Sequence, residues 1–209
     1  KNYTKKALSE SRKSKYLRVL INMNRLRSAQ SFSENRIWIN IPEFKLRFYK
    51  KNEIKAIHKL VVGAEATPTP EVQAILERIV LYPYWSVPAS IARNEVVPAV
   101  KRGAGYLSSH NLKVYRNDIE VDPYSIDWSA IPSGKCPYRF KQEPGTSNSL
   151  GIIKFEFPNI HNVYVHDTPT KHLFANEFRA YSHGCMRCEY PVKLGRTIYH
   201  YDTETTGLT

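Results

Sequence analysis

The residues best suited to chemistry lie in one short run, Tyr181-Ser182-His183-Gly184-Cys185-Met186-Arg187. Cys185 is the candidate nucleophile, because a thiolate attacks a carbonyl carbon efficiently and its pKa falls near cations or near N–H groups at a helix start. We therefore expect Cys185 to begin a helical turn. Gly184 can turn the backbone sharply and present N–H groups to a developing oxyanion. The run predicts acyl transfer through a thioester.

A cysteine nucleophile needs a base, and His166 is the best candidate. It ends the strand-like segment Val163-Tyr164-Val165-His166-Asp167 and can reach Cys185 if that strand lies beside the turn. Asp167 could orient the imidazole, although adjacent side chains on a strand point to opposite faces. His166 is expected to take the thiol proton and later protonate the leaving amine, whereas the role of Asp167 stays open.

The other polar residues of the run each allow two interpretations. Ser182 is better suited to capping the turn than to reacting. His183 is either a structural imidazole that braces the turn or a part of the oxyanion region. Arg187 could hold a peptide carboxylate or carbonyl as a planar fork, or it could form a surface ion pair.

The spacing of these residues also carries a resemblance. His166, fifteen further residues, and then Ser-His-Gly-Cys followed by an apolar residue and Arg resemble the signature of the L,D-transpeptidases, the YkuD-type catalytic domain. Most of residues 17–190 resembles the larger periplasmic murein L,D-transpeptidases of Gram-negative bacteria. The segments that carry this wider likeness are residues 36–42, 61–63, 69–70, 82–88 and 151–155.

The resemblance implies a fold that is mainly β with α insertions, a β-sandwich catalytic domain with an inserted cap or lid and an N-terminal helix. Residues 1–35 are then a basic helical segment and residues 36–209 the catalytic domain, with the cap at about 87–143. In this family the corresponding insertion covers the active-site cleft. The matching positions give catalytic roles to Cys185, His166, His183 and Gly184, and substrate-binding roles to Arg187, Ser182 and Asp167.

The reaction that the resemblance implies is cleavage of the bond before the terminal D-alanine of a tetrapeptide stem. The acyl group would pass through a Cys185 thioester to an amine of a second stem, forming a 3→3 cross-link. Neither a metal nor an organic cofactor is required. The expected partners are peptidoglycan stem peptides, without nucleic acid or a membrane span. We expect a monomer in the periplasm or cell envelope of a Gram-negative bacterium.

Two other classes of protein remain open. A non-catalytic wall-binding or scaffolding protein would keep the cleft without turnover. Cys185 and Cys188 form a C-x-x-C pair that could be a redox couple or half of a zinc site, with His183 or His166 as further ligands. Cys188 is also readily explained as a small buried apolar residue. With Cys136, the three thiols cannot complete a disulfide framework.

The net charge of +12 is concentrated at the N-terminus, where residues 1–27 hold nine Lys or Arg against the single acid Glu10. Tyr16, Leu17, Leu20 and Met23 form a rough helical stripe, which predicts a solvated helix packed by one face. The charge is accompanied by no recognised nucleic-acid motif. No apolar run approaches the roughly 20 residues that span a bilayer.

Periodicity predicts the elements around the site. Residues 37–41, 44–48 and 54–62 read as a β-meander, and residues 152–157 and 162–166 as later strands. Thr69 and Pro70 predict an N-cap and first helical residue, with a helix to about residue 79. Short helices are expected around residues 93–97 and 104–109, and a polar tail from 197 to 209. The remaining histidines are expected to be exposed or hydrogen-bonded: His58, His110, His161, His172 and His200.

Overall fold

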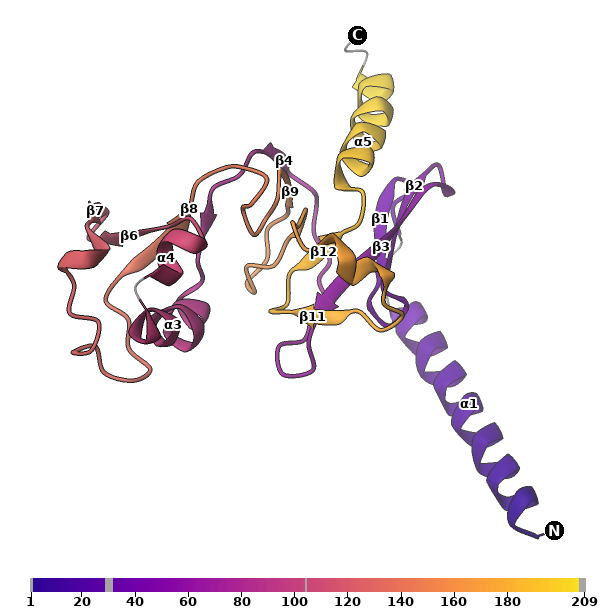
Figure 1. Ribbon diagram of the computed structural model, residues 1–209. Coiled ribbons are helices and arrows are strands. Elements are labelled where there is room, and N and C mark those ends of the chain that lie inside the picture. The colour runs from indigo at the N-terminus through magenta and orange to yellow at the C-terminus, as the bar shows by residue number, and fades with distance from the viewer. Residues whose placement is uncertain (1, 29–31, 104, 207–209) are drawn as a thin grey trace.

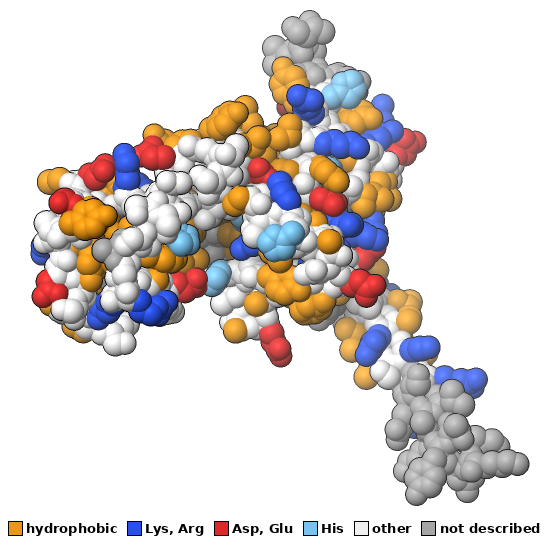
Figure 2. Space-filling model, in the orientation of Figure 1, with side chains coloured by type: hydrophobic (Ala, Val, Ile, Leu, Met, Phe, Trp, Pro, Cys, Tyr) orange, Lys and Arg blue, Asp and Glu red, His pale blue; other side chains and the backbone are white. Residues whose placement is uncertain are grey.

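The computed structural model describes residues 2–28, 32–103 and 105–206. Helix α1 (Asn2–Ser28) extends away from the remainder of the molecule (Figure 1). The predicted helix is confirmed, but the prediction that it packs by one face is wrong. Tyr16 and Leu17 are 67% and 57% exposed, and Figure 2 shows apolar and basic side chains exposed along the same stretch. The apolar residues spread around the helix, since Val19 and Ile21 are exposed as well.

The main sheet has eight strands and contains the C-terminal motif. Its order is β1-β2-β3-β12-β10-β9-β4, and β11 pairs with β3 off this path. The pairs β10–β12 and β11–β3 are parallel, and the other pairs are antiparallel. The predicted meander is confirmed as the first three strands. The strands are β1 (Arg36–Asn40), β2 (Lys45–Lys50), β3 (Glu53–Gly63), β4 (Arg78–Leu81), β9 (Ile153–Glu156), β10 (Val165–His166), β11 (Ala180–Ser182) and β12 (Met186–Cys188).

Helix α5 (Pro191–Thr206) packs against the core of this sheet. Leu194, Ile198 and Tyr201 recur at helical spacing and contact the cluster that contains Phe155 and Leu46. The prediction of a polar tail is therefore wrong for residues 197–206, because the apolar residues of this stretch complete a helical face. Residues 207–209 of that predicted tail lie outside the described residues.

A second sheet, with the order β5-β8-β6-β7, is wholly antiparallel and lies beside the main sheet (Figure 1). It has a hydrophobic cluster of its own, built around Val114, Phe140 and Trp128. The short helices expected here are confirmed. The elements are β5 (Trp85–Ser86), α2 (Ala89–Ile91), the π-helical η2 (Ala92–Val96), α3 (Val97–Arg102), α4 (Gly105–Ser109), β6 (Leu112–Arg116), β7 (Ile119–Val121), the 3-10 turn η3 (Pro123–Ser125) and β8 (Arg139–Gln142).

The mainly β class is thus confirmed, with two sheets and few helices. The two sheets have separate hydrophobic clusters, so the finer expectation of a β-sandwich stays a prediction. The expected boundaries of the N-terminal segment and of the cap also stay predictions. We call residues 87–141 the cap from here on. No helix among the described residues is long and apolar enough to cross a membrane.

The helix predicted after Thr69 is absent, and that prediction is wrong. Residues 70–77 form neither helix nor strand, and Ile79 lies in β4, opposite Phe155 of β9. Two apolar residues of the predicted helix stay at the surface, since Val72 and Ile75 are 38% and 80% exposed. Tertiary pairing overrides the local preference. The Thr69 side chain, expected to cap the helix, makes other contacts that are described below.

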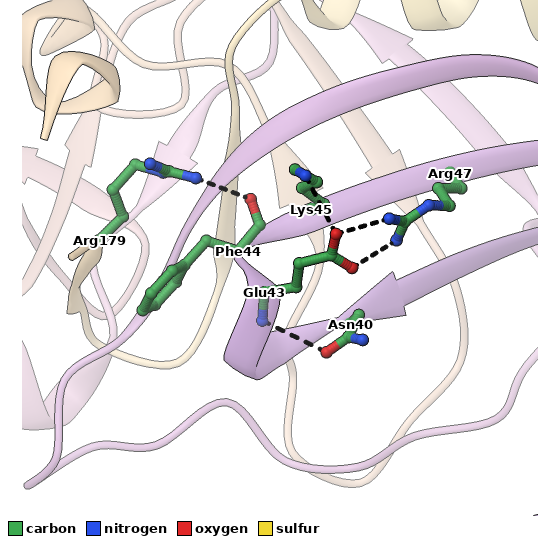
Figure 3. Close-up of polar contacts among 6 residues, drawn as sticks. All are labelled: Asn40, Glu43, Phe44, Lys45, Arg47 and Arg179. Atoms are coloured by element: carbon green, nitrogen blue, oxygen red, sulfur yellow. Dashed lines mark hydrogen bonds and ion pairs between the residues drawn. The ribbon is translucent and has the colours of Figure 1, made fainter. Parts of the chain in front are cut away.

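A 3-10 turn, η1 (Ile41–Glu43), connects β1 to β2 and carries a charged cluster (Figure 3). The Glu43 carboxylate accepts hydrogen bonds from Arg47 at 2.6 and 2.7 Å and from Lys45 at 3.0 Å. These two cations lower the pKa of Glu43 to about 2. Asn40 caps the turn by accepting the Glu43 N–H at 3.3 Å. The cluster fixes the connection that leads into the central strands.

Arg179 ties the segment before the nucleophile run to these strands (Figure 3). It is only 7% exposed and donates to the carbonyls of Leu60 at 3.1 Å and Phe44 at 3.3 Å. It also donates to the Asn176 carbonyl at 2.6 Å, just after the 3-10 turn η4 (Lys171–Ala175). A fourth bond runs to the Glu177 carbonyl at 3.3 Å, so the buried guanidinium satisfies four carbonyls and anchors the chain as it enters β11.

Candidate active site

The pairing of β10 with β12 brings the two halves of the motif together. The strands are parallel, with Val165 opposite Met186 and His166 opposite Arg187. The Met186 N–H donates to the Tyr164 carbonyl at 3.0 Å, which extends the register so that Tyr164 faces Cys185. Since alternate residues share a face of a sheet, the side chains of these two positions lie on the same face as His166 and Arg187.

The opposite face of the same strands belongs to the core. Val165, Met186 and Cys188 are 3%, 4% and 0% exposed and lie in the main-sheet cluster. Cys188 is thus a buried apolar residue, and burial raises its pKa to about 12. Cys185 and Cys188 point to opposite faces of β12, which gives no support to a C-x-x-C redox couple. The described residues contain no group of three His, Cys, Asp or Glu placed to hold a metal.

The nucleophile turn, residues 182–185, connects β11 to β12 and does not begin a helix. That prediction is wrong because Met186 pairs into the sheet at once. The Ser182 hydroxyl donates to the Cys185 carbonyl at 2.5 Å and accepts the Gly184 N–H at 3.1 Å, so Ser182 caps the turn as expected. Gly184 has φ of 111°, which an L side chain rarely adopts. Its N–H is engaged in this arrangement, and the catalytic role expected for Gly184 stays a prediction.

A loop that follows β3 contacts the nucleophile turn through side-chain hydrogen bonds. The buried Thr69 hydroxyl accepts the Gly63 N–H at 2.8 Å and donates to the Gly184 carbonyl at 2.8 Å. Thr67 donates to the Ser182 carbonyl at 3.0 Å. A side chain at Gly63 would lie 2.2 Å from the Thr67 carbonyl oxygen, so only glycine permits this close approach. The sequence pattern predicts Thr69 as a helix N-cap, so this role of its hydroxyl was not expected.

His166 is 5% exposed, and its Nδ1 hydrogen-bonds to the backbone carbonyl of Asp167. Because a carbonyl only accepts, Nδ1 carries the proton and Nε2 remains an acceptor. Burial, followed by the charge of Arg187, lowers the pKa of His166 to about 3. Lys154, opposite His166 on β9, acts in the same direction. The imidazole is therefore neutral, with Nε2 free of a proton, and its surroundings disfavour the protonated form.

Asp167 orients this region through its backbone and its carboxylate. The carboxylate accepts the Ile152 N–H at 3.1 Å and pairs with Lys171. A Cβ at Gly151 would lie 2.2 Å from the Asp167 carboxylate, so glycine leaves room for it. The carboxylate is thus occupied by contacts within the protein. The side chain sits on the side of the strand opposite His166, whereas the backbone carbonyl orients the imidazole.

The surroundings of Cys185 act on its thiol in both directions. Burial raises the pKa of Cys185, whereas hydrogen bonding to Tyr164 and the charges of Lys154 and Arg187 lower it. The Tyr164 pKa is raised by burial and by Cys185, and its hydroxyl also interacts with Trp85 of β5. The Tyr164 ring lies 5.6 Å from the His166 ring and 4.2 Å from the Lys154 Nζ. Motif reasoning missed Tyr164, although its place two residues before His166 predicts a shared face.

Arg187 and His183 differ in their surroundings. Arg187 is partly buried beside Cys185, and no hydrogen bond or ion pair of its guanidinium is recorded among the described residues. His183 points elsewhere, since its Nε2 lies 2.7 Å from a Glu95 carboxylate oxygen of the cap. This contact could not be predicted from the sequence, because the partners are 88 positions apart.

Two buried amides at the base of the cap maintain its connection to the main sheet. Asn148 donates to the carbonyls of Pro83 at 3.2 Å and Glu143 at 3.0 Å, and Gln142 donates to the His110 carbonyl at 2.7 Å. These contacts are structural.

Comparison with protein families matches residues 34–202 to YkuD, described as the L,D-transpeptidase catalytic domain. A Haemophilus influenzae protein named "Putative L,D-transpeptidase" is 36% identical over 173 residues, which make up 82% of this chain and 35% of that protein. The chain thus spans about a third of that relative's length. Among solved structures, the Ldtfm–avibactam carbamoyl enzyme matches 75% of this chain and 41% of its own, at 12% identity and a TM-score of 0.32.

The chain belongs to the L,D-transpeptidase catalytic-domain family. The family match covers most of the chain and includes every residue of the candidate site. The resemblance inferred from the sequence is therefore confirmed.

Proposed function

We propose that this protein is a cysteine-dependent peptidoglycan L,D-transpeptidase. One observation carries the proposal: the β10–β12 register places Cys185, Tyr164, His166 and Arg187 on one face of the sheet. Family membership supports the reaction class. The substrate would be a tetrapeptide stem, cleaved before its terminal D-alanine, and the products a free D-alanine and a 3→3 cross-linked dimer.

The reaction begins with proton transfer from the Cys185 thiol to Nε2 of His166. The thiolate attacks the amide carbon, and the tetrahedral intermediate collapses as the C–N bond breaks and His166 protonates the leaving amine. An amine of the second stem then attacks the thioester and gives a proton to His166. The departing thiolate regains that proton, so the enzyme is restored without a net change.

The electrostatics favour one partner of the first step and oppose the other. The charges of Lys154 and Arg187 favour a Cys185 thiolate but disfavour the protonated His166 that this step forms. The Tyr164 hydroxyl supports the thiolate by hydrogen bonding. The Cys185 N–H, for which no partner is recorded among the described residues, is the donor that we assign to the oxyanion, because the Gly184 N–H is held by Ser182.

Arg187 is the residue that we assign to substrate, since a partly buried guanidinium without a protein partner suits a stem carboxylate. Ser182, Gly184 and Asp167 are positioning residues in this proposal, and His183 lies at the entrance. A place in the periplasm or cell envelope follows from the substrate. The expected monomer and the sandwich arrangement of the catalytic domain belong to the same proposal.

The test compares wild-type protein with Cys185→Ala on a purified disaccharide-tetrapeptide, with products identified by mass spectrometry. We expect the variant to lose roughly 10⁴-fold or more of the activity while its circular dichroism is unchanged. Cys136→Ala is the matched control, since Cys136 is a partly buried thiol of the cap. Retained dimer formation by Cys185→Ala would refute the mechanism, and tripeptide without dimer would indicate hydrolysis instead of cross-linking.

A further inference from the structure

The cap is joined to the main sheet through few contacts. Its hydrophobic cluster is separate from that of the main sheet, so no shared core holds the two together. At its base, Asn148 and Gln142 fasten the chain where it enters and leaves. The cap can therefore change its angle about this base at little cost in buried apolar surface.

Away from the base, one side-chain ion pair connects the cap to the nucleophile turn. His183 Nε2 lies 2.7 Å from Glu95 Oε1, and each side chain is 48% exposed. Among the described residues, no other polar side-chain contact is recorded between residues 87–141 and the β11–β12 turn. In the space-filling view, a histidine and an acidic side chain lie together where the two parts meet (Figure 2).

Local structure explains why Glu95 reaches this position. Pro98 lacks an N–H and its ring crowds the carbonyl of Asn94, so the continuous helix of residues 89–102 widens into the π turn η2. Ala92 and Val96 of this turn are 3% and 2% exposed and anchor it in the cap cluster. Glu95 is left half-exposed on the side that faces His183.

The other titratable groups near Glu95 belong to the cap itself. Tyr106 is close enough for Glu95 to contribute to its raised pKa, after burial, and Arg102 opposes that effect. Neither residue forms a recorded ion pair with Glu95 among the described residues. Glu95 therefore has His183 as its recorded ionic partner there.

We propose that Glu95 is a positioning residue that latches the cap over the nucleophile turn, and that this latch must open before a stem reaches Cys185. The inference rests on the proposed function only in taking Cys185 as the nucleophile. In this arrangement Cys185 is only partly exposed, and His166, which must contact the leaving amine, is 5% exposed. An ion pair between exposed side chains contributes little, a factor of about two to five, so the latch opens readily.

The first test measures access to Cys185 without any turnover. Wild type and Glu95→Gln are treated with iodoacetamide, and alkylation of each cysteine is followed by peptide mass spectrometry. We expect the rate at Cys185 to rise about two- to fivefold in the variant, with the rate at Cys136 unchanged. Glu95→Asp should give an intermediate rate. Glu120→Gln, which removes a Lys113 partner within the cap, is the matched control and should match wild type.

The second test separates access from catalysis. If closure limits binding, Glu95→Gln lowers the KM for the stem by the same factor as it raises alkylation, while kcat is retained. An unchanged alkylation rate would overturn the latch, and so would a fall in kcat without faster alkylation. Since alkylation needs no peptidoglycan chemistry, loss of the proposed activity would leave this result intact, and the two proposals can fail separately.

Discussion

The two sheets of this protein are built in opposite ways. The cap sheet is antiparallel, and all its strands come from residues 85–142. Its hydrophobic cluster is built from residues of the same part of the chain. The main sheet joins distant segments, and its centre is the parallel pair of β10 and β12, each of only two or three residues. The candidate site lies where distant segments pair, because the β10–β12 register places His166 and Cys185 on one face of the sheet.

The two sheets also use their charged groups differently. In the cap, Asp118 pairs with Arg139 and Glu120 with Lys113 at the surface, where such pairs contribute little. In the main sheet, Lys154 and Arg187 flank a buried imidazole and add to the effect of burial in lowering its pKa. The difference shows that a basic residue affects a buried group only where the sheet places the two close together.

The largest effect expected from this comparison comes from removing one aromatic ring from each cluster. Phe140 in the cap and Phe155 in the main sheet are each 1% exposed. Phe140→Ala and Phe155→Ala should each lower the stability of their own region by about 3–5 kcal/mol, because each leaves a cavity. Hydrogen exchange followed by mass spectrometry should show lost protection in β6 and β8 for the first variant, and in β9 and β10 for the second.

Phe178→Ala provides the control, since Phe178 is 64% exposed and belongs to neither cluster. It should leave protection in both sheets near the wild-type level. Equal loss of protection in both sheets for Phe140→Ala would mean that the molecule unfolds as one unit, and the contrast drawn between the sheets would be wrong.

Much of the main sheet was predictable because its signals are local. Alternation at Ile37, Ile39 and Ile41 predicted the first strand, and His166 does end its strand. The motif predicted Cys185 as nucleophile and His166 as base from their types and spacing, and these roles stay predictions. The family match then confirmed the class that they indicate.

The errors share one cause, which is that tertiary contacts redirected residues with clear local preferences. Thr69 has the pattern of an N-cap but bridges Gly63 and Gly184 instead. Cys185 was expected at a helix start, where the N–H groups would favour a thiolate, but Met186 pairs into β12. Glu95 had no signal at all, because its partner His183 comes from a distant part of the chain.

A smaller effect is expected from removing the hydroxyl that holds the nucleophile turn. Thr69→Val keeps the shape of the side chain but leaves the Gly63 N–H and the Gly184 carbonyl without this partner. We expect a loss of about 2–4 kcal/mol in urea unfolding and a fall in kcat of about ten- to a hundredfold, because the turn is released.

Thr197→Val is the matched control, since the Thr197 hydroxyl caps a backbone carbonyl within α5, remote from the turn. It should change stability by less than about 1 kcal/mol and leave kcat unchanged. A Thr69→Val protein that loses stability but keeps full kcat would show that the loop supports the sheet without positioning the nucleophile.

The smallest effect concerns His58 in β3, where the prediction of an exposed or hydrogen-bonded histidine is wrong. It is 2% exposed, and within the described part of the chain neither ring nitrogen has a hydrogen-bond partner. Burial, and then the charge of Lys193, lowers its pKa. The unfolded chain therefore binds more protons at His58 than the folded chain does. The contribution of His58 to the free energy of unfolding is constant above about pH 6.5 and falls as the pH drops below that value.

His58→Leu should remove this dependence and raise stability by about 1–2 kcal/mol at pH 8, since two unsatisfied polar atoms leave the core. Urea unfolding at pH 8 and pH 5 should show the advantage of the variant growing at the lower pH. His161→Leu, at an exposed histidine, controls for the loss of one imidazole and should not alter the pH dependence. If His58→Leu is less stable than wild type at both pH values, the His58 imidazole must be hydrogen-bonded in solution. The main sheet would then resemble the cap in having a core without unsatisfied polar groups among its described residues.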